Sequence, residues 1–212
     1  MTLHIPYIEG LDKLSLTSLD LTLEEHGAKA DINRVNWPEG FPYKPACYVA
    51  AAHDGENLAL LFHVRGLDLR AMETEDNGRM WEDSCVEFFV QDPAGDKYYN
   101  FELNCAGVLL ACEGAGREGR LRRDASVLGA IKRYSTIEGA PFQILGDICT
   151  WSAGMLIPLR FFGAAPGQTL RANFYKCGDR TAHVHFLSWN PIDLPKPDFH
   201  RPEFFGEITL DK

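Results

Sequence analysis

Residues 98–104 alternate apolar and polar side chains with the period of a β-strand. Successive side chains of a strand point to opposite faces, so the apolar residues share one face and the polar residues share the other. The polar residues of this segment are Asn100, Glu102 and Asn104. The pattern predicts a strand with one face on the core and one face of hydrogen-bonding groups.

Residues 170–176 repeat the alternation, and their polar face carries Arg171, Asn173 and Tyr175. Across both segments the polar groups are amide, carboxylate, guanidinium and phenol, rather than the Lys and Thr of an ordinary solvated sheet. Such groups hydrogen-bond a polyhydroxylated ligand. Trp81 and Trp189 lie close to the two segments along the chain. The combination predicts a polar binding face with aromatic neighbours.

Short apolar runs separated by turn residues extend along most of the chain and predict strands. The predicted strands are residues 15–23 (an edge strand), 46–52, 57–65, 84–91, 97–105, 108–112, 129–137, 142–149, 151–157, 168–177, 184–189 and 205–210. The segments 28–45, 66–80 and 113–125 predict loops, and short helices are predicted near 124–128 and 159–163. Many short strands with few helices indicate an all-β, antiparallel, jelly-roll-like β-sandwich. No linker divides the chain, so we expect a single domain over residues 1–212.

Composition narrows the classes of partner. The 30 acidic and 21 basic residues give a net charge of −9, which argues against nucleic acid as a ligand. No apolar run approaches the roughly 18 residues of a membrane span, so we expect no membrane partner. The N-terminus lacks the basic start and apolar stretch of a signal peptide, so the sequence as it stands predicts a cytoplasmic protein, with an omitted leader as the alternative.

The six cysteines form no C-x-x-C pair, and most lie inside apolar runs. This distribution favours buried reduced thiols over a disulfide framework. It also does not favour a zinc cluster, which usually shows paired spacing. Trp37 and Trp151 are predicted to be core residues.

The chain resembles the family 9 carbohydrate-binding modules, and more closely their single-domain "family 9-like" relatives. The resemblance spans roughly residues 28–210, and its segments follow the family's order. The matching segments are 81–90, 98–107, 151–158, 171–177, 185–191 and 199–210. No single motif among them is diagnostic; the ordered set is fairly specific.

The resemblance implies a β-sandwich that binds a saccharide, at a free sugar end in well-known members. It implies that Trp81 and Trp189 clamp a sugar ring, that Glu87 binds hydroxyls, and that Asn104 supplies an amide to them. The sequence departs at Glu102, where better-known members carry a basic residue, so the ligand is expected to differ. Known members also bind structural calcium, for which the Asp92/Asp96 turn could supply oxygens.

A sugar ring needs an aromatic surface for its C–H face and paired donors and acceptors for its hydroxyls. On these grounds we predict a ligand site without catalytic function, in an aromatic-walled, polar-floored cleft, linked to carbohydrate catabolism. The predicted ligand-binding residues are Trp81, Glu87, Asn100, Glu102, Asn104, Arg171, Asn173, Tyr175 and Trp189. Each has a structural alternative: the tryptophans as core aromatics, Arg171 as an ion-pair partner of Glu102 or Glu87, and the amides as a solvated face.

Two other functions use the same residues. If Glu87 and Glu102 face each other across adjacent strands, their carboxyls are spaced for a retaining glycoside hydrolase. Two close carboxyls also raise one pKa, as a general acid requires. In the third alternative, a protein-interaction or assembly module, the Trp and Phe side chains form an exposed apolar patch. The oligomeric state, the identity of the sugar and the presence of a metal remain open at this point.

Overall fold

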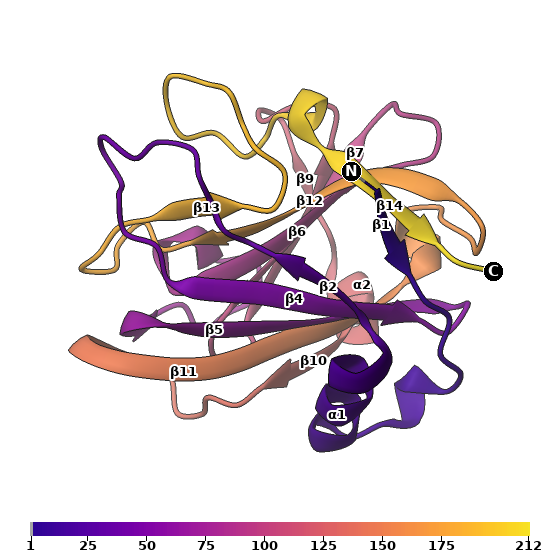
Figure 1. Ribbon diagram of the computed structural model, residues 1–212, viewed down its shortest axis with the longest axis horizontal. Coiled ribbons are helices and arrows are strands. Elements are labelled where there is room, and N and C mark those ends of the chain that lie inside the picture. Colours follow the sequence, from indigo (N-terminus) through magenta and orange to yellow (C-terminus); the bar gives the residue numbers. More distant parts are fainter. Residues whose placement is uncertain (1) are drawn as a thin grey trace.

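Two β-sheets packed face to face form the body of the protein (Figure 1). The computed structural model describes residues 2–212. The first sheet has the order β1 (Thr2–Ile5), β14 (Gly206–Leu210), β12 (Thr169–Cys177), β6 (Cys85–Gln91), β7 (Tyr98–Asn104), β8 (Leu109–Gly114) and β9 (Leu121–Arg122). In the same sheet β13 (Phe186–Ser188) pairs with β12, and β3 (Arg34–Val35) pairs with β13.

The second sheet has the order β10 (Lys132–Ser135), β11 (Phe142–Pro158), β5 (Asn57–Ala71), β4 (Ala46–His53) and β2 (Ala28–Asp31). All strand pairs of the two sheets are antiparallel except β1–β14, which places the first and last strands of the chain side by side (Figure 1). The helices are α1 (Leu16–His26) and α2 (Ala125–Ala130), with 3-10 turns at Leu11–Lys13, Met80–Glu82, Leu159–Phe161 and Pro202–Phe204. The predicted antiparallel β-sandwich is confirmed.

Three apolar layers stabilise this arrangement. The main core lies between the sheets and includes Phe62, Phe88 and Phe174. A second cluster covers part of the outer face of the first sheet. A third lies between the second sheet and α1. Both tryptophans predicted to be core residues are buried: Trp151 lies in the main core and Trp37 lies in the second cluster.

Residues 15–23 were predicted to be an edge strand, and this is wrong. Ser15 accepts the backbone N–H of Ser18 and so begins α1 as its N-cap. Leu16, Leu19 and Leu23 recur at helical spacing, and Leu19 and Leu23 are fully buried in the third cluster. The weak alternation of this segment therefore hid a stronger period of 3.6.

Strand boundaries differ from the prediction in the connecting segments. β5 continues to Ala71, into the predicted 66–80 loop, because β11 pairs with it along almost its whole length. β11 is one strand with a bulge between Ile144 and Ile148, not two strands. Short edge strands also form at residues 2–5, 28–31, 34–35 and 121–122. The predicted short helices are present at 125–130 and, as a 3-10 turn, at 159–161.

No helix of the described part of the chain combines the length and the apolar character that crossing a bilayer requires.

The packing of α1 gives a direct stability test. Leu19→Ala leaves a cavity in the third cluster, and we expect it to lower the free energy of unfolding by about 2–4 kcal/mol. Leu21 lies on the same helix but is 68% exposed, so Leu21→Ala is the matched control and should cost less than about 0.5 kcal/mol. Denaturant unfolding measures both; equal losses would contradict the helix register.

Candidate functional site

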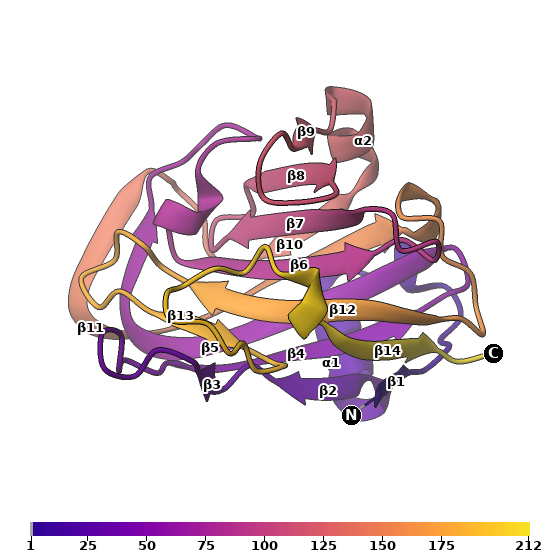
Figure 2. The ribbon, with the colours of Figure 1, turned by 90° about the horizontal axis from the view of Figure 1, so that it is seen from above.

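A pocket of about 410 Å³ opens on the outer face of the first sheet. Figure 2 shows this face, with β8, β7, β6 and β12 side by side and the segment that follows β13 crossing in front of them. The floor consists of side chains from these four strands: Glu87, Asn100, Glu102, Leu110, Cys112 and Cys177. The walls come from Trp81 and from loops on both sides of the floor.

Strand register brings two carboxyls together on this floor. Glu87 of β6 lies directly opposite Glu102 of β7. Both are almost completely buried, at 2% and 3% exposure. Their side chains point away from the main core because Val86, Phe88 and Leu103, at the intervening positions, point into it. The alternation that identified these strands therefore also explains why the two acids meet.

Burial changes the proton affinity of both carboxyls. Loss of hydration raises the pKa of Glu102 to about 7, although the Asn100 amide and the Arg120 guanidinium act to lower it. Burial also raises the pKa of Glu87 well above its usual range, and the neighbouring Cys177 and Glu102 add to the rise. Glu87 Oε1 accepts a hydrogen bond from the Cys177 thiol at 3.0 Å. Both carboxyls therefore favour the protonated form more than an exposed carboxyl does.

Arg120 fastens the loop between β8 and β9 to the floor. Its Nε and Nη2 donate to Asn100 Oδ1 at 2.9 and 2.7 Å, and Nη2 also donates to Tyr98 O. Its Nη1 donates to the carbonyls of Gly116 and Gly114, and its guanidinium lies 4.0 Å from the centre of the Tyr98 ring. All five N–H groups are thus used within the protein, so Arg120 shapes one wall.

The opposite wall is aromatic and neutral. Phe199 stacks on Tyr175 at 4.1 Å between ring centres, and Phe186 packs edge-on against Phe199. His200 Nδ1 is 3.0 Å from the Tyr98 hydroxyl, and burial lowers the pKa of His200 to about 4. The pocket therefore offers apolar ring surface and an uncharged imidazole at neutral pH.

Charged side chains link the two walls. Arg117 Nη1 lies 3.0 Å from Asp198 Oδ1, which joins the β8–β9 loop to the segment after β13. Asp179 also lines the pocket, and burial raises its pKa to about 6 with help from Glu82. The pocket combines aromatic ring surfaces with side chains that donate or accept hydrogen bonds. This combination suits a ligand with many hydroxyls.

Four of the nine predicted ligand-binding residues are brought together in this pocket: Trp81, Glu87, Asn100 and Glu102. The other five lie elsewhere. Each of these five residues has a contact within the protein that explains its position.

The predicted pairing of Trp189 with Trp81 does not form. β13 pairs with β12 so that Phe186 lies opposite Cys177 and Leu187 opposite Lys176. Trp189 therefore has the parity of Leu187 and packs against the main core, 5.6 Å from Phe174 between ring centres. Its ring also lies against Gly206, where an added Cβ would approach to 2.8 Å. Phe186, not Trp189, is the β13 aromatic in the pocket.

Asn104 shares the face of Glu102, but its hydrogen-bonding capacity is used internally. Its amide donates to Glu73 O and Asp83 Oδ2, and its oxygen accepts from the N–H groups of Ala106 and Val108. It therefore secures the turn after β7 and does not line the pocket.

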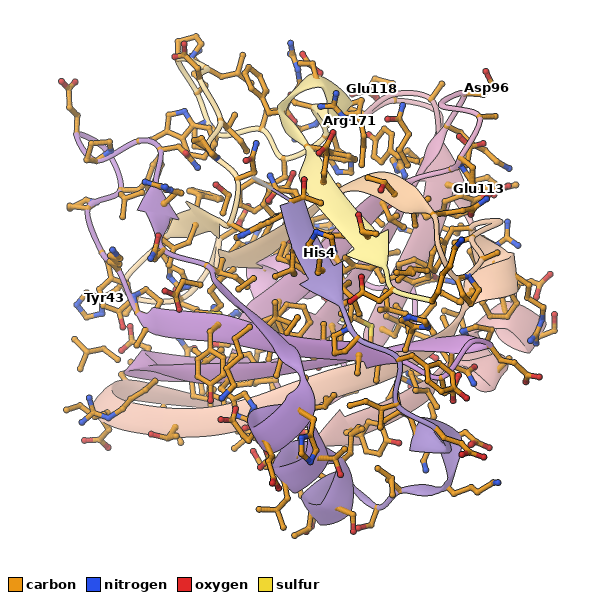
Figure 3. The ribbon with its side chains drawn as sticks, turned by 45° about the vertical axis from the view of Figure 1, so that its right-hand side comes forward. His4, Tyr43, Asp96, Glu113, Glu118 and Arg171 are labelled. Atoms are coloured by element: carbon orange, nitrogen blue, oxygen red, sulfur yellow. The ribbon has the colours of Figure 1, made fainter. Side chains whose placement is uncertain are left out.

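Arg171 lies beside the turn before β14, as Figure 3 shows. Its Nη2 donates to the carbonyls of Pro202, Glu203 and Phe205, with the shortest bond 2.8 Å long. It thus neither lines the pocket nor pairs with Glu87 or Glu102. Arg171 therefore has a structural role, but its partners are backbone carbonyls and not the carboxylate that we expected as the alternative to a ligand.

Asn173 and Tyr175 also have structural roles. The Asn173 amide donates to Asn190 O and accepts from Asn190 N–H, which holds the segment after Trp189 against β12. The Tyr175 hydroxyl donates to Phe199 O, and its ring lies beneath Phe199. Neither residue lines the pocket, although Tyr175 supports its aromatic wall.

Several residues of the pocket were not predicted from the sequence. Phe186 could have been found, because the alternation of residues 186–189 places it opposite in parity to Leu187 and Trp189. Asp179, Asp198 and Arg117 follow no periodicity. They reach the pocket only because the loops fold over the sheet.

Among the described residues, the Asp92/Asp96 turn lies in no cluster of side-chain ligands that points to the expected calcium. Asp92 Oδ1 accepts the N–H of Lys97, as in an ordinary turn. Neither aspartate belongs to a group of three or more possible ligands among the described residues, whereas calcium takes six to eight oxygens.

Comparison with known proteins identifies the family. The sequence profile described as carbohydrate-binding family 9 matches residues 18–210. The chain belongs to carbohydrate-binding family 9. No curated protein matches this family 9 chain.

Solved structures agree with the fold of this family 9 protein. A protein of Bacteroides uniformis ATCC 8492, to which carbohydrate binding is ascribed, is 41% identical, with coverage of 98% of this chain and 97% of that chain and a TM-score of 0.90. A family 9 module of Caldicellulosiruptor kristjanssonii in complex with cellotriose is 11% identical, with coverage of 100% and 94% and a TM-score of 0.62. The complex of a family 9 module of the same organism with glucose is 12% identical, with coverage of 100% of this chain and 96% of that chain and a TM-score of 0.61. At these low identities the two complexes show the shared fold.

His200 predicts a pH dependence of stability for this family 9 protein. Its folded pKa of about 4 lies below the unfolded value of about 6.5, so the unfolded state binds the extra proton in between. As the pH falls from about 6.5 to about 4, His200 should cost up to about 3 kcal/mol of stability, at about 1.4 kcal/mol per pH unit.

The comparison of His200→Gln with wild type by denaturant unfolding at several pH values checks this dependence. The variant should be less stable at pH 7, because the Tyr98 contact is altered, but should lose less on acidification. His26→Gln, at the exposed end of α1, is the control and should follow wild type. If the free energy of unfolding fell equally with pH in wild type and in His200→Gln, the predicted role of His200 in the pH dependence would be refuted.

Proposed function

We propose that the pocket on the first sheet binds a saccharide and does not transform it. The observation that carries the proposal is the combination, in a family 9 chain, of aromatic walls with a floor of buried hydrogen-bonding groups. Trp81 and Phe186 supply apolar surface for the C–H faces of a sugar ring. Glu87, Glu102 and Asp179 supply oxygens for hydroxyls, and His200 supplies an uncharged imidazole.

The shape of the pocket favours the end of a sugar chain. The loop that Arg120 holds forms one wall, and the Arg117–Asp198 ion pair links that loop to the other wall. An internal segment of a polysaccharide needs an open groove at both ends, whereas a free end needs only one opening. A protein that recognises free ends fits a role in carbohydrate catabolism, where degradation generates such ends.

The two other functions considered from the sequence have no specific support. A retaining hydrolase needs one carboxylate as an ionised nucleophile. Burial raises the pKa of both Glu87 and Glu102, so the site does not stabilise either carboxyl in the ionised form that a nucleophile requires. For an assembly module we expected exposed Trp and Phe side chains, but the exposed large apolar residues of the described chain are Tyr7, Leu21, Met72, Leu121, Ile144, Leu145 and Ile148.

Titration with mono- and oligosaccharides, including glucose and cellotriose, tests the proposal by calorimetry and tryptophan fluorescence. We expect at least one saccharide to bind, and Trp81→Ala to weaken it about tenfold or more through loss of ring stacking. Trp189→Phe is the matched control, because it keeps an aromatic ring in the main core, and it should bind as wild type does.

Three outcomes would contradict the proposal. The first is the absence of binding to every saccharide by folded protein. The second is a loss of binding in Trp189→Phe but not in Trp81→Ala. The third is release of the reporter from aryl glycosides that is abolished by Glu87→Gln, which would favour the hydrolase.

A further inference from the structure

Two cysteines far apart in the sequence meet beneath the pocket. Cys85 of β6 lies directly opposite Cys177 of β12, and both are buried. Glu87 lies two residues after Cys85 on the same face of β6. Its Oε1 is 3.0 Å from Cys177 Sγ, and one donor atom from each of the three residues lies within 4.8 Å of the other two. Strand register thus assembles a donor set that sequence spacing does not reveal.

This donor set has the composition of a zinc site. Zinc binds thiolate sulfur at about 2.3 Å and carboxylate oxygen at about 2.0–2.2 Å in tetrahedral geometry, so its ligand atoms lie about 3.3–3.8 Å apart. The Cys85, Glu87 and Cys177 donors are already within about 1 Å of that spacing. Sulfur ligands disfavour calcium and magnesium and favour zinc and its heavier analogue cadmium.

The surroundings of the cluster lack a compensating cation. Lys176 follows the opposite parity of β12, and its Nζ contacts Cys177 O and His185 Nε2. Arg120 uses all five of its N–H groups on other acceptors. Among the described residues, no basic side chain therefore donates to the Cys85–Glu87–Cys177 cluster.

A second observation points to a ligand at this place. Glu102, opposite Glu87, is 3% exposed, and its Oε2 is buried without a hydrogen-bond partner. An unpartnered carboxylate oxygen at a buried site is costly. Glu102 lies outside the cluster, so a water bound to a cation held by Glu87 and the two thiolates would give this oxygen a partner.

We propose that Cys85, Cys177 and Glu87 bind a divalent cation of the zinc type at the floor of the pocket. Glu87 and Cys177 both line the pocket, so the cation has a route of entry from it. Three protein ligands with one open position form the arrangement that lets zinc bind water or a ligand oxygen. On binding, the two thiols and the Glu87 carboxyl release their protons to solvent, and the two thiolate sulfurs and a carboxylate oxygen coordinate the cation.

Cadmium and cobalt titrations of the full-length chain test the proposal, after chelator treatment under reducing conditions. Cadmium should produce a thiolate-to-metal absorption band in the ultraviolet that saturates at one equivalent. Cobalt should produce visible bands typical of a four-coordinate sulfur site. Competition with a chromophoric chelator then gives the zinc affinity.

Variants distinguish this cluster from adventitious thiol binding. Cys85→Ser and Cys177→Ser should each weaken metal binding at least tenfold and reduce the charge-transfer band. Glu87→Gln should weaken binding while keeping that band. Cys112→Ser is the matched control, since Cys112 is buried and lines the same pocket but lies outside the cluster. It should bind metal as wild type does.

The proposal is overturned if folded wild type, checked by circular dichroism, shows no thiolate band. It is also overturned if Cys112→Ser weakens binding as much as Cys177→Ser. If the cysteine variants fail to fold, Glu87→Gln decides the case: an affinity equal to that of wild type overturns the site. These readouts contain no saccharide, so their failure is distinguishable from failure of the proposed function.

Discussion

The two-residue alternation of the first sheet is the constraint on which the rest of the structure depends. Each of its central strands must fill the core with one set of side chains and leave the other set on the outer face. On β6 the inward set is Val86, Phe88 and Val90, and the outward set includes Cys85, Glu87 and Phe89. Because the loops cover this outer face only in part, one sheet supports a second apolar cluster and a polar pocket.

The loops depend on that face in turn. Arg120 reaches the floor through Asn100, and Phe199 rests on Tyr175. Both walls are therefore positioned by outward-facing strand residues rather than by contacts between the loops alone. This coupling explains why several polar residues that looked available for a ligand are engaged within the protein. Asn100 holds a wall, Asn104 secures a turn and Asn173 anchors the segment after β13.

Much of this was predictable from local patterns. The alternation of residues 98–104 and 170–176 correctly separated core side chains from outward ones, and four of the residues predicted to bind a ligand line one pocket. The error at Trp189 arose from treating proximity in sequence as proximity in space without following its parity. Arg171 and Asn104 were misjudged because a sequence does not show which backbone groups will need a partner.

Glu102 Oε2 has a consequence for the discrimination between ligands. No protein group among the described residues donates to this buried oxygen. A ligand that offers a donor there gives the oxygen a partner, whereas an analogue lacking that donor leaves it dehydrated and unpaired. The difference is about 1–3 kcal/mol, or roughly 5- to 150-fold in affinity. Selectivity in this pocket would then come less from attraction to the right ligand than from the dehydration penalty that a wrong one incurs.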